Sequence, residues 1–254
     1  MLIALLTDFG TRDYYVGAMK GVILGINPRA TIVDITHEIE PQNIQSAAFV
    51  LRACYRDFPV GTIFLCVVDP GVGSKRRGII VGSKDHYFVG PDNGLFGFVI
   101  DADCTICSIE IDDLFHKPVS STFHGRDIFA PVAAHLSKGR VGLEFGPRIT
   151  DPVVLPDVEP KQIGPEEFEA RIIHIDRFGN LVTNITADRV TGAIELTVGT
   201  TRITAFRDHY EGGDPGVPFA IVGSAGFLEI SVKAGSAAEA LEAKVGMLVT
   251  IKFR

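Results

Sequence analysis

The chain has 254 residues, of which 46% are hydrophobic and 22% charged, so it is long and apolar enough to bury a full globular core. Its formal net charge of −7 and isoelectric point near 5.5 argue against a nucleic-acid backbone as the partner and favour a small molecule. The N-terminal apolar run reaches Asp8 without a basic lead, and no stretch approaches the roughly 20 apolar residues of a membrane span. We therefore expect no signal peptide, no membrane contact and a cytoplasmic location.

The first 146 residues alternate between strand-like and helix-like segments. Apolar runs bounded by polar or glycine residues predict strands at LIALLTDFG, TIVDIT and TIFLCVVD. Helical spacing of apolar residues predicts helices from Asp13 to Ile26, from Asn43 to Phe58 and from Arg126 to Leu136. GIIVGS followed by HYFVGPDNG predicts a hairpin. Together these segments predict an α/β domain over residues 1–146 with a largely parallel central sheet.

The composition changes after Gly146. Prolines recur at positions 147, 152, 156, 160 and 165, which is too dense for a helix or a central strand, so residues 147–168 are predicted to be a linker. Residues 169–254 contain short β-like runs separated by glycine turns, with SAAEALEA as the helical piece. They predict a smaller, all-β, barrel-like C-terminal domain.

The cysteines do not indicate a metal or redox site. Cys104 and Cys107 form a lone CxxC inside a strand-like segment, whose pleat sends the two side chains to opposite faces. No second CxxC and no nearby histidine pair completes a zinc site. We expect buried, reduced thiols at the four cysteines and no metal.

Polar side chains follow several of the predicted strands. In open α/β sheets ligands bind beyond the carboxyl ends of the strands. Asp8 and Asp69 occupy such ends, and Thr122 to Asp127 precede a predicted helix. Any one of these aspartates alone would as readily be a helix cap or a turn residue, but the three clusters together favour a shared site.

The loop VVDPGVGSKRR, residues 67–77, is glycine-rich without matching a phosphate-binding motif. It lacks both G-x-x-x-x-G-K-[ST] and G-x-G-x-x-G. Asp69 and Arg76 lie seven positions apart across the turn and can fold back on each other, so that the guanidinium fixes the carboxylate bidentately. If His124 joins them, the trio could orient a water and accept its proton, although a lone histidine is more often structural.

A second polar pattern lies in the C-terminal half, in HIDRFGNLVTNI. Asp176, Phe178 and Asn180 offer a carboxylate, a flat apolar ring and an amide within five residues. That set suits a purine nucleoside, with the carboxylate on the ribose hydroxyls, the ring against the base and the amide on its polar edge. The alternative is an ordinary turn between strands.

Seven motifs, in order and over nearly the whole chain, resemble one family. They are TDFGTRDYYVG, VDITHEI, VVDPGVGSKRR, FVGPDNGL, STFHGRDIFAP, IDRFGNLVTNI and GSAGFLEISVKAGSAA. The sequence resembles the SAM (S-adenosyl-L-methionine) hydroxide adenosyltransferases, the adenosine-forming SAM hydrolases related to the fluorinating and chlorinating enzymes. The resemblance implies an α/β domain followed by a β-barrel-like domain. It also implies a homotrimer, with each site between the N-terminal domain of one subunit and the C-terminal domain of its neighbour.

The resemblance also implies roles for single residues. The family's catalytic set falls on Asp69, Arg76 and His124. Its substrate-binding positions fall on residues from both halves of the chain: Asp8 for the ribose; Phe123 near the reacting carbon; Asp176, Phe178 and Asn180 facing adenosine; Ser224 and Glu229 near adenine or the methionine end; and Tyr210 for base stacking.

The implied reaction is SAM plus water giving adenosine and L-methionine, with SAM as the substrate and no cofactor. The sulfonium leaves as a neutral thioether, so the chemical difficulty lies in stripping, aiming and deprotonating a water. Either His124 or Asp69 could accept the proton, with Arg76 as the positioning charge.

Departures from the halogenating relatives favour water over halide. Where those enzymes carry a tyrosine and a threonine in the glycine loop, this chain has Asp69 and Val72; their serine near the halide is Gly125, and their SAM-covering tryptophan aligns with Gln42. A carboxylate beside the nucleophile repels an anion. The alternatives are a SAM-dependent halogenase and a non-catalytic or very slow SAM or adenosine binder. A binder could dispense with the catalytic set, yet all three members are present.

Overall fold

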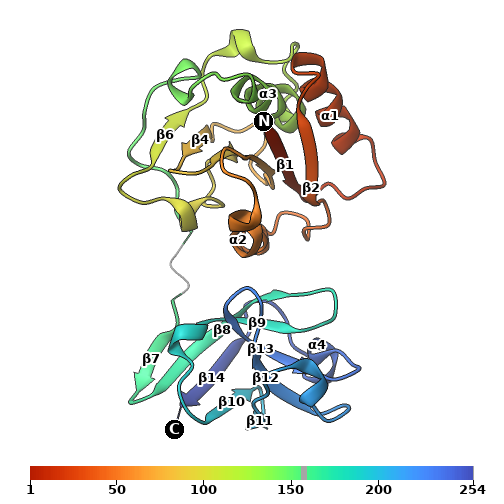
Figure 1. The fold of residues 1–254 in the computed structure, drawn as a ribbon, viewed down its shortest axis with the longest axis vertical. Helices are drawn as coiled ribbons and strands as arrows, with labels where there is room; N and C mark the ends of the chain where they lie inside the picture. Colours follow the sequence, from red (N-terminus) through yellow and green to blue (C-terminus); the bar gives the residue numbers. More distant parts are fainter. Residues whose placement is uncertain (156–158, 254) are drawn as a thin grey trace. The chain divides into compact units, whose positions relative to one another are not determined.

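The computed structural model describes residues 1–155 and 159–253, and the chain divides into two compact units, Met1–Leu155 and Pro156–Arg254 (Figure 1). The segment predicted as a linker, residues 147–168, includes strand β7 (Lys161–Gly164), and its residues 156–158 lie outside the described part of the chain. The predicted domain limits stay a prediction.

Unit 1 is built on a six-stranded sheet in the order β2-β1-β3-β5-β4-β6 (Figure 1). Its strands are β1 (Leu2–Thr7), β2 (Thr31–Thr36), β3 (Ile63–Val67), β4 (Gly78–Gly82), β5 (Tyr87–Pro91) and β6 (Thr105–Ser108). Three neighbouring pairs are parallel, but β4 runs antiparallel to both β5 and β6. The sheet is therefore mixed, where the sequence predicts a largely parallel one, because the predicted β4–β5 hairpin reverses one strand.

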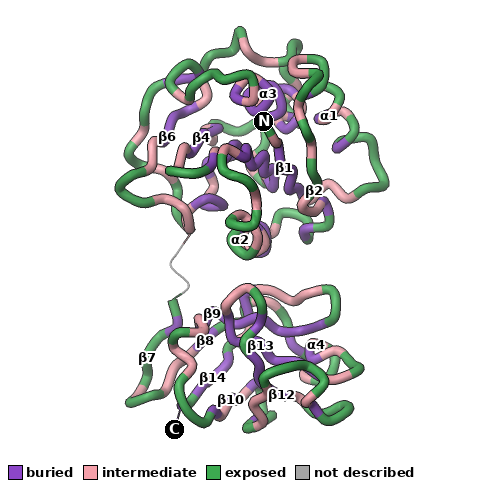
Figure 2. Tube along the Cα trace, viewed as in Figure 1, coloured by how far each residue is buried: buried purple, intermediate pink, exposed green. Residues whose placement is uncertain are grey.

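Both faces of this sheet are buried, which explains the uninterrupted apolar runs of its central strands. In β1, Ile3 and Leu5 pack under helices α1 (Tyr15–Ile26) and α3 (Ala130–Ser137), while the alternate residues face helix α2 (Ile44–Cys54). Figure 2 shows the buried residues concentrated along the strands. This three-layer packing leaves the strand ends and their loops to carry polar side chains.

The predicted helix from Arg126 to Leu136 does not begin as an α-helix. Its first part is a π-helical turn, η4 (Gly125–Phe129), which runs directly into α3. Short 3₁₀ turns elsewhere in unit 1 are η1 (Tyr55–Asp57), η2 (Gly97–Val99), η3 (Asp112–Leu114) and η5 (Gly142–Glu144). The π turn lies at the candidate site described below.

Unit 2 is an antiparallel, nearly closed sheet, as the sequence predicts for its C-terminal half. Its path runs β11-β10-β14-β8-β9-β13-β12, and β7 pairs with β8. The segment after β11 closes the path, because Arg207 N–H donates to the Ala220 carbonyl of β12 at 2.9 Å. The elements not yet given are β8 (Glu167–Ile175), β9 (Leu181–Thr186), η6 (Ala187–Arg189), β10 (Ile194–Val198), β11 (Thr201–Ile203), η7 (Tyr210–Gly212), β12 (Pro218–Val222), β13 (Phe227–Val232), α4 (Ala237–Ala240) and β14 (Leu248–Phe253).

The four cysteines are free thiols. Cys66 and Cys107 are buried, while Cys54 and Cys104 are half-buried. Burial raises the pKa of all four thiols, that of Cys54 to about 11, so they stay protonated and unreactive at neutral pH. Of the helices in the described residues, none is long and apolar enough to cross a membrane.

Candidate active site

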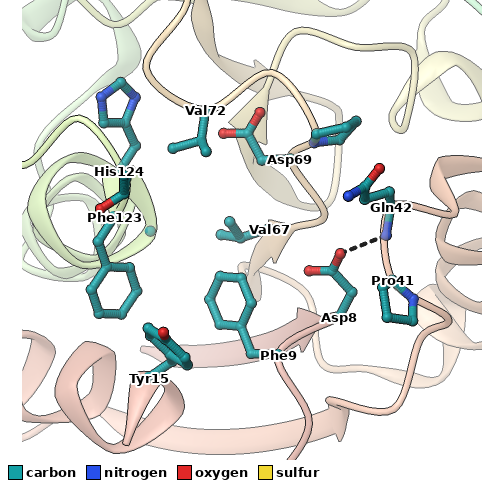
Figure 3. A pocket seen from close by; sticks show the side chains of 13 residues that line it. Asp8, Phe9, Tyr15, Pro41, Gln42, Val67, Asp69, Val72, Phe123 and His124 are labelled. Carbon is teal, nitrogen blue, oxygen red and sulfur yellow. Dashed lines mark hydrogen bonds between the residues drawn. The ribbon is translucent and has the colours of Figure 1, made fainter. Parts of the chain in front are cut away.

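Two neighbouring strands of unit 1 end in aspartates. β1 and β3 are parallel, and their last residues, Thr7 and Val67, lie opposite each other. Asp8 and Asp69 follow these residues and therefore emerge at the same edge of the sheet (Figure 3). They border a cavity of about 400 Å³. Its walls come from four segments: Asp8, Phe9 and Tyr15; Pro41 and Gln42; Val67, Asp69, Pro70 and Val72; and Thr122 to Gly125.

The glycine loop folds Arg76 back onto Asp69, as its spacing predicts. Arg76 Nε donates to both carboxylate oxygens, at 2.8 and 3.0 Å, and Nη2 donates to Oδ2 as well. Gly73 allows the turn, because its φ is +76° and an added Cβ would lie 2.3 Å from the Ser121 carbonyl oxygen. The side chains of Arg76 and Asp69 are only 13% and 5% exposed, so the pair is largely shielded from water.

His124 joins this pair through Arg76. Arg76 Nη2 lies 2.9 Å from His124 Nδ1. A guanidinium can only donate, so Nδ1 accepts this bond and the neutral ring carries its proton on Nε2. Burial and the Arg76 charge both lower the pKa of His124, against weaker opposing effects of Asp69 and Asp127. The imidazole is therefore neutral at pH 7, with Nδ1 already occupied.

Asp8 is held from the opposite wall of the cavity. The backbone N–H of Gln42 donates to Asp8 Oδ2 at 2.8 Å (Figure 3). Gln42 adopts a φ of +68°, a left-handed conformation that non-glycine residues rarely take and that often marks functional sites. Burial raises the pKa of Asp8, while the hydrogen bond from Gln42 acts in the opposite direction. One oxygen of Asp8 is thus fixed and the other faces the cavity side.

A buried histidine that sequence analysis did not single out supports the Asp8 turn. The His37 side chain is 4% exposed, and its Nδ1 lies 2.9 Å from the Thr7 hydroxyl. Its carbonyl accepts from Gly10 N–H at 2.7 Å, so both ends of the Thr7–Gly10 turn are tied to this residue. On the other side of the ring, Nε2 lies 3.1 Å from Asp34. The motif VDITHEI contains His37, but its contact with Thr7 depends on strand pairing.

Aromatic rings form one side of the cavity. Phe123, 6% exposed, packs edge-on against Phe9 and Tyr15, with ring centroids 6.0 and 5.1 Å away (Figure 3). Sequence analysis predicts Phe123 at the site but not the other two rings. Gly125 lies beside this group of rings, and an added Cβ there would make ordinary van der Waals contact, at 3.5 Å, with both phenylalanines. The cavity therefore offers π faces on one side and carboxylates on the other.

Arg77, which follows Arg76, serves the scaffold. Its Nε donates to Asp92 at 2.9 Å, and its Nη1 donates to Asp151 at 2.8 Å. Asp92 also accepts from Val153 N–H at 2.8 Å. Arg77 and Asp92 thereby tie residues 151–153 to the ends of β4 and β5, next to the Asp69–Arg76 pair.

In unit 2, the predicted nucleoside-binding residues form a tight turn between β8 and β9. Asp176 Oδ1 accepts from the backbone N–H groups of Phe178 and Asn180, at 2.9 and 2.8 Å, and Oδ2 accepts from the Asn180 amide at 2.8 Å. Gly179 provides the positive φ of the turn. Phe178 is left 76% exposed, an unusual position for a bare aromatic ring.

A second pair lies close to this turn. Tyr210 donates its hydroxyl to Glu229 Oε2 at 3.0 Å. Burial raises the pKa of both groups, that of Tyr210 to about 12, and the charge of Asp176 adds to the effect on each. Ser224 is exposed in the turn between β12 and β13. Unit 2 therefore brings together Asp176, Phe178 and Asn180 in one turn, couples Tyr210 to Glu229 and holds Ser224 in a separate turn. The other predicted residues lie in unit 1: Asp8, Asp69, Arg76, Phe123 and His124.

Within residues 1–155 and 159–253, no group of three or more histidine, cysteine, aspartate or glutamate side chains is placed to hold a metal ion. The polar groups of the cavity are instead engaged in ion pairs and hydrogen bonds with protein atoms. The carboxylates that line the cavity of unit 1 are suited to an uncharged or cationic molecule.

The chain thus combines an α/β unit, with an ion-paired carboxylate on a cavity at its strand ends, and a barrel-like unit. The N-terminal domain of the SAM hydroxide adenosyltransferases matches residues 3–146, and the C-terminal domain of that family matches residues 170–250. The chain belongs to the SAM hydroxide adenosyltransferase family.

Individual relatives agree with this assignment. A (R)-S-adenosyl-L-methionine hydrolase of Thermus thermophilus is 38% identical over 98% of both chains, and one of Methanocaldococcus jannaschii is 44% identical over 75% of this chain and 69% of its own. A fluorinase of Actinoplanes is 27% identical over 98% of this chain and 97% of its own. The crystal structure of an uncharacterized conserved protein from Thermotoga maritima is 41% identical and superimposes with a TM-score of 0.91 over 99% of this chain and 100% of that chain.

Proposed function

We propose that the protein hydrolyses SAM to adenosine and L-methionine by attack of water on C5′. Water oxygen forms the new bond to C5′, the C5′–S bond breaks, and its electron pair turns the sulfonium into a neutral thioether. The water gives up one proton. Relatives named (R)-S-adenosyl-L-methionine hydrolase, at 35–44% identity, support this reaction.

The observation that carries the proposal is the hydrogen-bonded series Asp69–Arg76–His124 at the wall of the cavity. Water is a weak nucleophile, so the protein must aim it and remove its proton. Asp69 offers a carboxylate held by two Nε contacts of Arg76, and His124 offers a neutral ring on the same cavity. A fixed carboxylate also repels halide, which favours water over the fluorinase reaction.

Between the two candidate proton acceptors, the hydrogen bonds favour Asp69. His124 Nδ1 accepts from Arg76, and its Nε2 carries the ring proton, so the neutral ring has no free lone pair in its plane. Nε2–H can donate to the water oxygen and orient it. Asp69 still has oxygen lone pairs and is the acceptor that we assign, with Arg76 holding its geometry.

The rest of the cavity suits the remaining parts of SAM. Asp8, fixed by Gln42, would accept hydrogen bonds from the ribose hydroxyls. The rings of Phe9, Tyr15 and Phe123 would face the sulfonium, because a cation is attracted to an aromatic face. Phe123 would stand nearest the reacting carbon. The sulfonium is itself an activated leaving group, so we propose no cofactor.

The adenosine contacts are assigned to unit 2, within a homotrimer whose sites combine unit 1 of one subunit with unit 2 of a neighbour. The exposed ring of Phe178 would stack on adenine, and Asn180 and Asp176 would meet its polar edge and the ribose. Tyr210, Glu229 and Ser224 would bind the adenine or methionine end. A cytoplasmic location stays a prediction from the sequence.

The reaction is tested with purified protein and SAM in ¹⁸O-labelled water. We expect one ¹⁸O atom in the 5′-hydroxyl of adenosine and an equal amount of L-methionine, both measured by mass spectrometry. Adenosine without the label, or no adenosine at all, would contradict hydrolysis at C5′.

The shared site is tested by subunit mixing. Light scattering should give a mass near three times the 27.4 kDa of the chain. Asp69→Ala and Asp176→Ala proteins, each inactive or impaired alone, should regain part of the activity after joint refolding, because some sites then combine two intact halves. No recovery, in a protein that stays monomeric, would show instead that one chain holds the whole site.

A further inference from the structure

The guanidinium of Arg76 has a third neighbour besides Asp69 and His124. Its Cζ atom lies 5.2 Å from the centroid of the Phe129 ring, within the range of a cation–π contact. Phe129 is fully buried, at 0% exposure, and it is not one of the residues that line the cavity. Its contact with Arg76 gives it a route to the site although it does not line the cavity.

The π turn accounts for this arrangement. Ala130 N–H donates to the Gly125 carbonyl, five residues earlier, which is the hydrogen bond of a π-helix. On an α-helix, residues three and four apart share a face, whereas a π turn shifts this relation to residues about five apart. His124 and Phe129 are five apart, and both contact Arg76. A regular α-helix would turn one of the two side chains away.

Surrounding residues hold the turn and make room for the ring. The Asp127 carbonyl bonds outside the helix, to His116 N–H at 2.9 Å, and the buried Asp127 carboxylate accepts from Ser120 N–H at 2.8 Å. At Gly78, an added Cβ would lie 2.8 Å from the Phe129 ring. The space that Phe129 fills beside Arg76 thus depends on glycine at position 78 in β4.

We propose that Phe129 is a positioning residue, which the π turn η4 presents to the Arg76 guanidinium so that this group stays between Asp69 and His124. This inference rests on the proposed function, in which Arg76 holds the proton acceptor. The ion pair with Asp69 holds one edge of the guanidinium and leaves its faces and its far edge uncovered. The ring face on one side and the His124 nitrogen at its edge confine it to one plane.

The first experiment compares Phe129→Leu with Phe145→Leu. Phe145 belongs to the same core and is also fully buried, but no contact joins it to Arg76 in the described residues, so it controls for the loss of a buried ring. For Phe129→Leu we expect kcat to fall about tenfold with KM nearly unchanged, because Phe129 does not line the cavity. Phe145→Leu should keep kcat. Equal kcat values in the two variants, each shown to be folded by circular dichroism, would overturn the proposal. If Phe129→Leu does not fold, Phe129→Met offers a longer and more adaptable apolar side chain, also without the ring.

The second experiment does not depend on turnover. The charged groups that face His124 are Arg76, Asp69 and Asp127. If Phe129→Leu lets Arg76 move away, the pKa of His124, followed by NMR, should rise. On an Arg76→Ala background, Phe129→Leu should cause no further rise. An unchanged His124 pKa in Phe129→Leu, or an equal rise on both backgrounds, would show that Phe129 does not act through Arg76. This titration remains decisive even if the wild-type protein fails the ¹⁸O test, so failure of the inference and failure of the proposed function are distinguishable.

Discussion

The two units each hold an aspartate just after a strand, but the two carboxylates have different partners. In unit 1, Asp69 is bound by a guanidinium seven residues ahead, and it lines a cavity. In unit 2, Asp176 is bound by two backbone N–H groups and an amide within four residues. The partner of Asp69 is a charged side chain, whereas two of the three donors to Asp176 are backbone N–H groups.

This difference separates a reactive carboxylate from one that shapes a turn. The Asp69 oxygens accept from the Arg76 side chain rather than from the backbone of the glycine loop, and lone pairs remain for a ligand. Asp176 closes the turn that displays Phe178 and Asn180, so its contribution to binding and its contribution to the fold are joined. Substitution of Asp69 should therefore lower mainly the rate, whereas substitution of Asp176 should lower both stability and substrate binding.

The largest effect is expected at Asp69. Asp69→Asn removes the proton acceptor, so kcat should fall by a factor of about 10²–10⁴. Adenosine affinity, measured by calorimetry, should stay nearly the same. Asp151→Asn is the matched control, because it breaks the neighbouring Arg77–Asp151 pair, which is exposed, contributes little to stability and does not touch the cavity. Loss of adenosine binding together with kcat would make Asp69 a substrate ligand instead.

The second largest effect is expected from pH. The folded-state pKa of His124 is lowered, so the ring is neutral at pH 7 and gains a proton only below its ordinary value of 6.5. The added proton must go to Nδ1, where it displaces the Arg76 hydrogen bond. The rate should therefore fall on the acid side, about tenfold per pH unit below the midpoint. His174 in unit 2 also has a pKa lowered by burial, so His174→Gln should leave this limb of the pH–rate profile in place.

At Asp176 the expected loss is shared between stability and binding. Asp176→Ala deletes the acceptor of three hydrogen bonds, which should lower the free energy of unfolding by about 1–3 kcal/mol. Denaturant titration measures this change, and steady-state kinetics should show a higher KM with a smaller change in kcat. A variant of unchanged stability would contradict the role assigned to Asp176 in closing the turn.

The smallest effect on stability is expected at Phe178. Because its ring is 76% exposed, Phe178→Ala should change the free energy of unfolding by only about 0.5 kcal/mol or less. The substitution nonetheless removes the ring that we propose stacks on adenine, so KM for SAM should rise while kcat is unchanged. If KM is unaffected as well, the exposed ring does not contact adenine.

Local sequence patterns predicted several parts of this structure correctly. The apolar runs became the buried strands because a sheet covered on both faces needs apolar residues at every position. The Asp69–Arg76 contact was predictable because the two residues are only seven positions apart across a glycine-rich turn, which can bring them beside each other. The sequence also predicted the β4–β5 hairpin. It did not predict that this hairpin makes the sheet mixed.

Other features had no local signal. His37 reaches Thr7 only because β1 and β2 pair, across 30 residues of sequence. Tyr210 meets Glu229 from 19 residues away, and its hydroxyl is engaged there, which the prediction of base stacking did not include. The predicted helix over Arg126–Leu136 concealed the π turn, because apolar spacing distinguishes a helix from a strand but does not distinguish one kind of helix from another.

The sequence alone determined the division into an α/β and an all-β half, the family, and the pairing of Asp69 with Arg76. The division and the pairing follow from periodicity, composition and short-range chain geometry, whereas the family follows from the resemblance of seven motifs. Only the tertiary structure decided that His124 and Phe129 both meet Arg76, that Nδ1 of His124 is occupied, and that His37 supports the Asp8 turn. Each of these depends on the packing of segments distant in sequence, where the position of a single atom sets which hydrogen bonds can form.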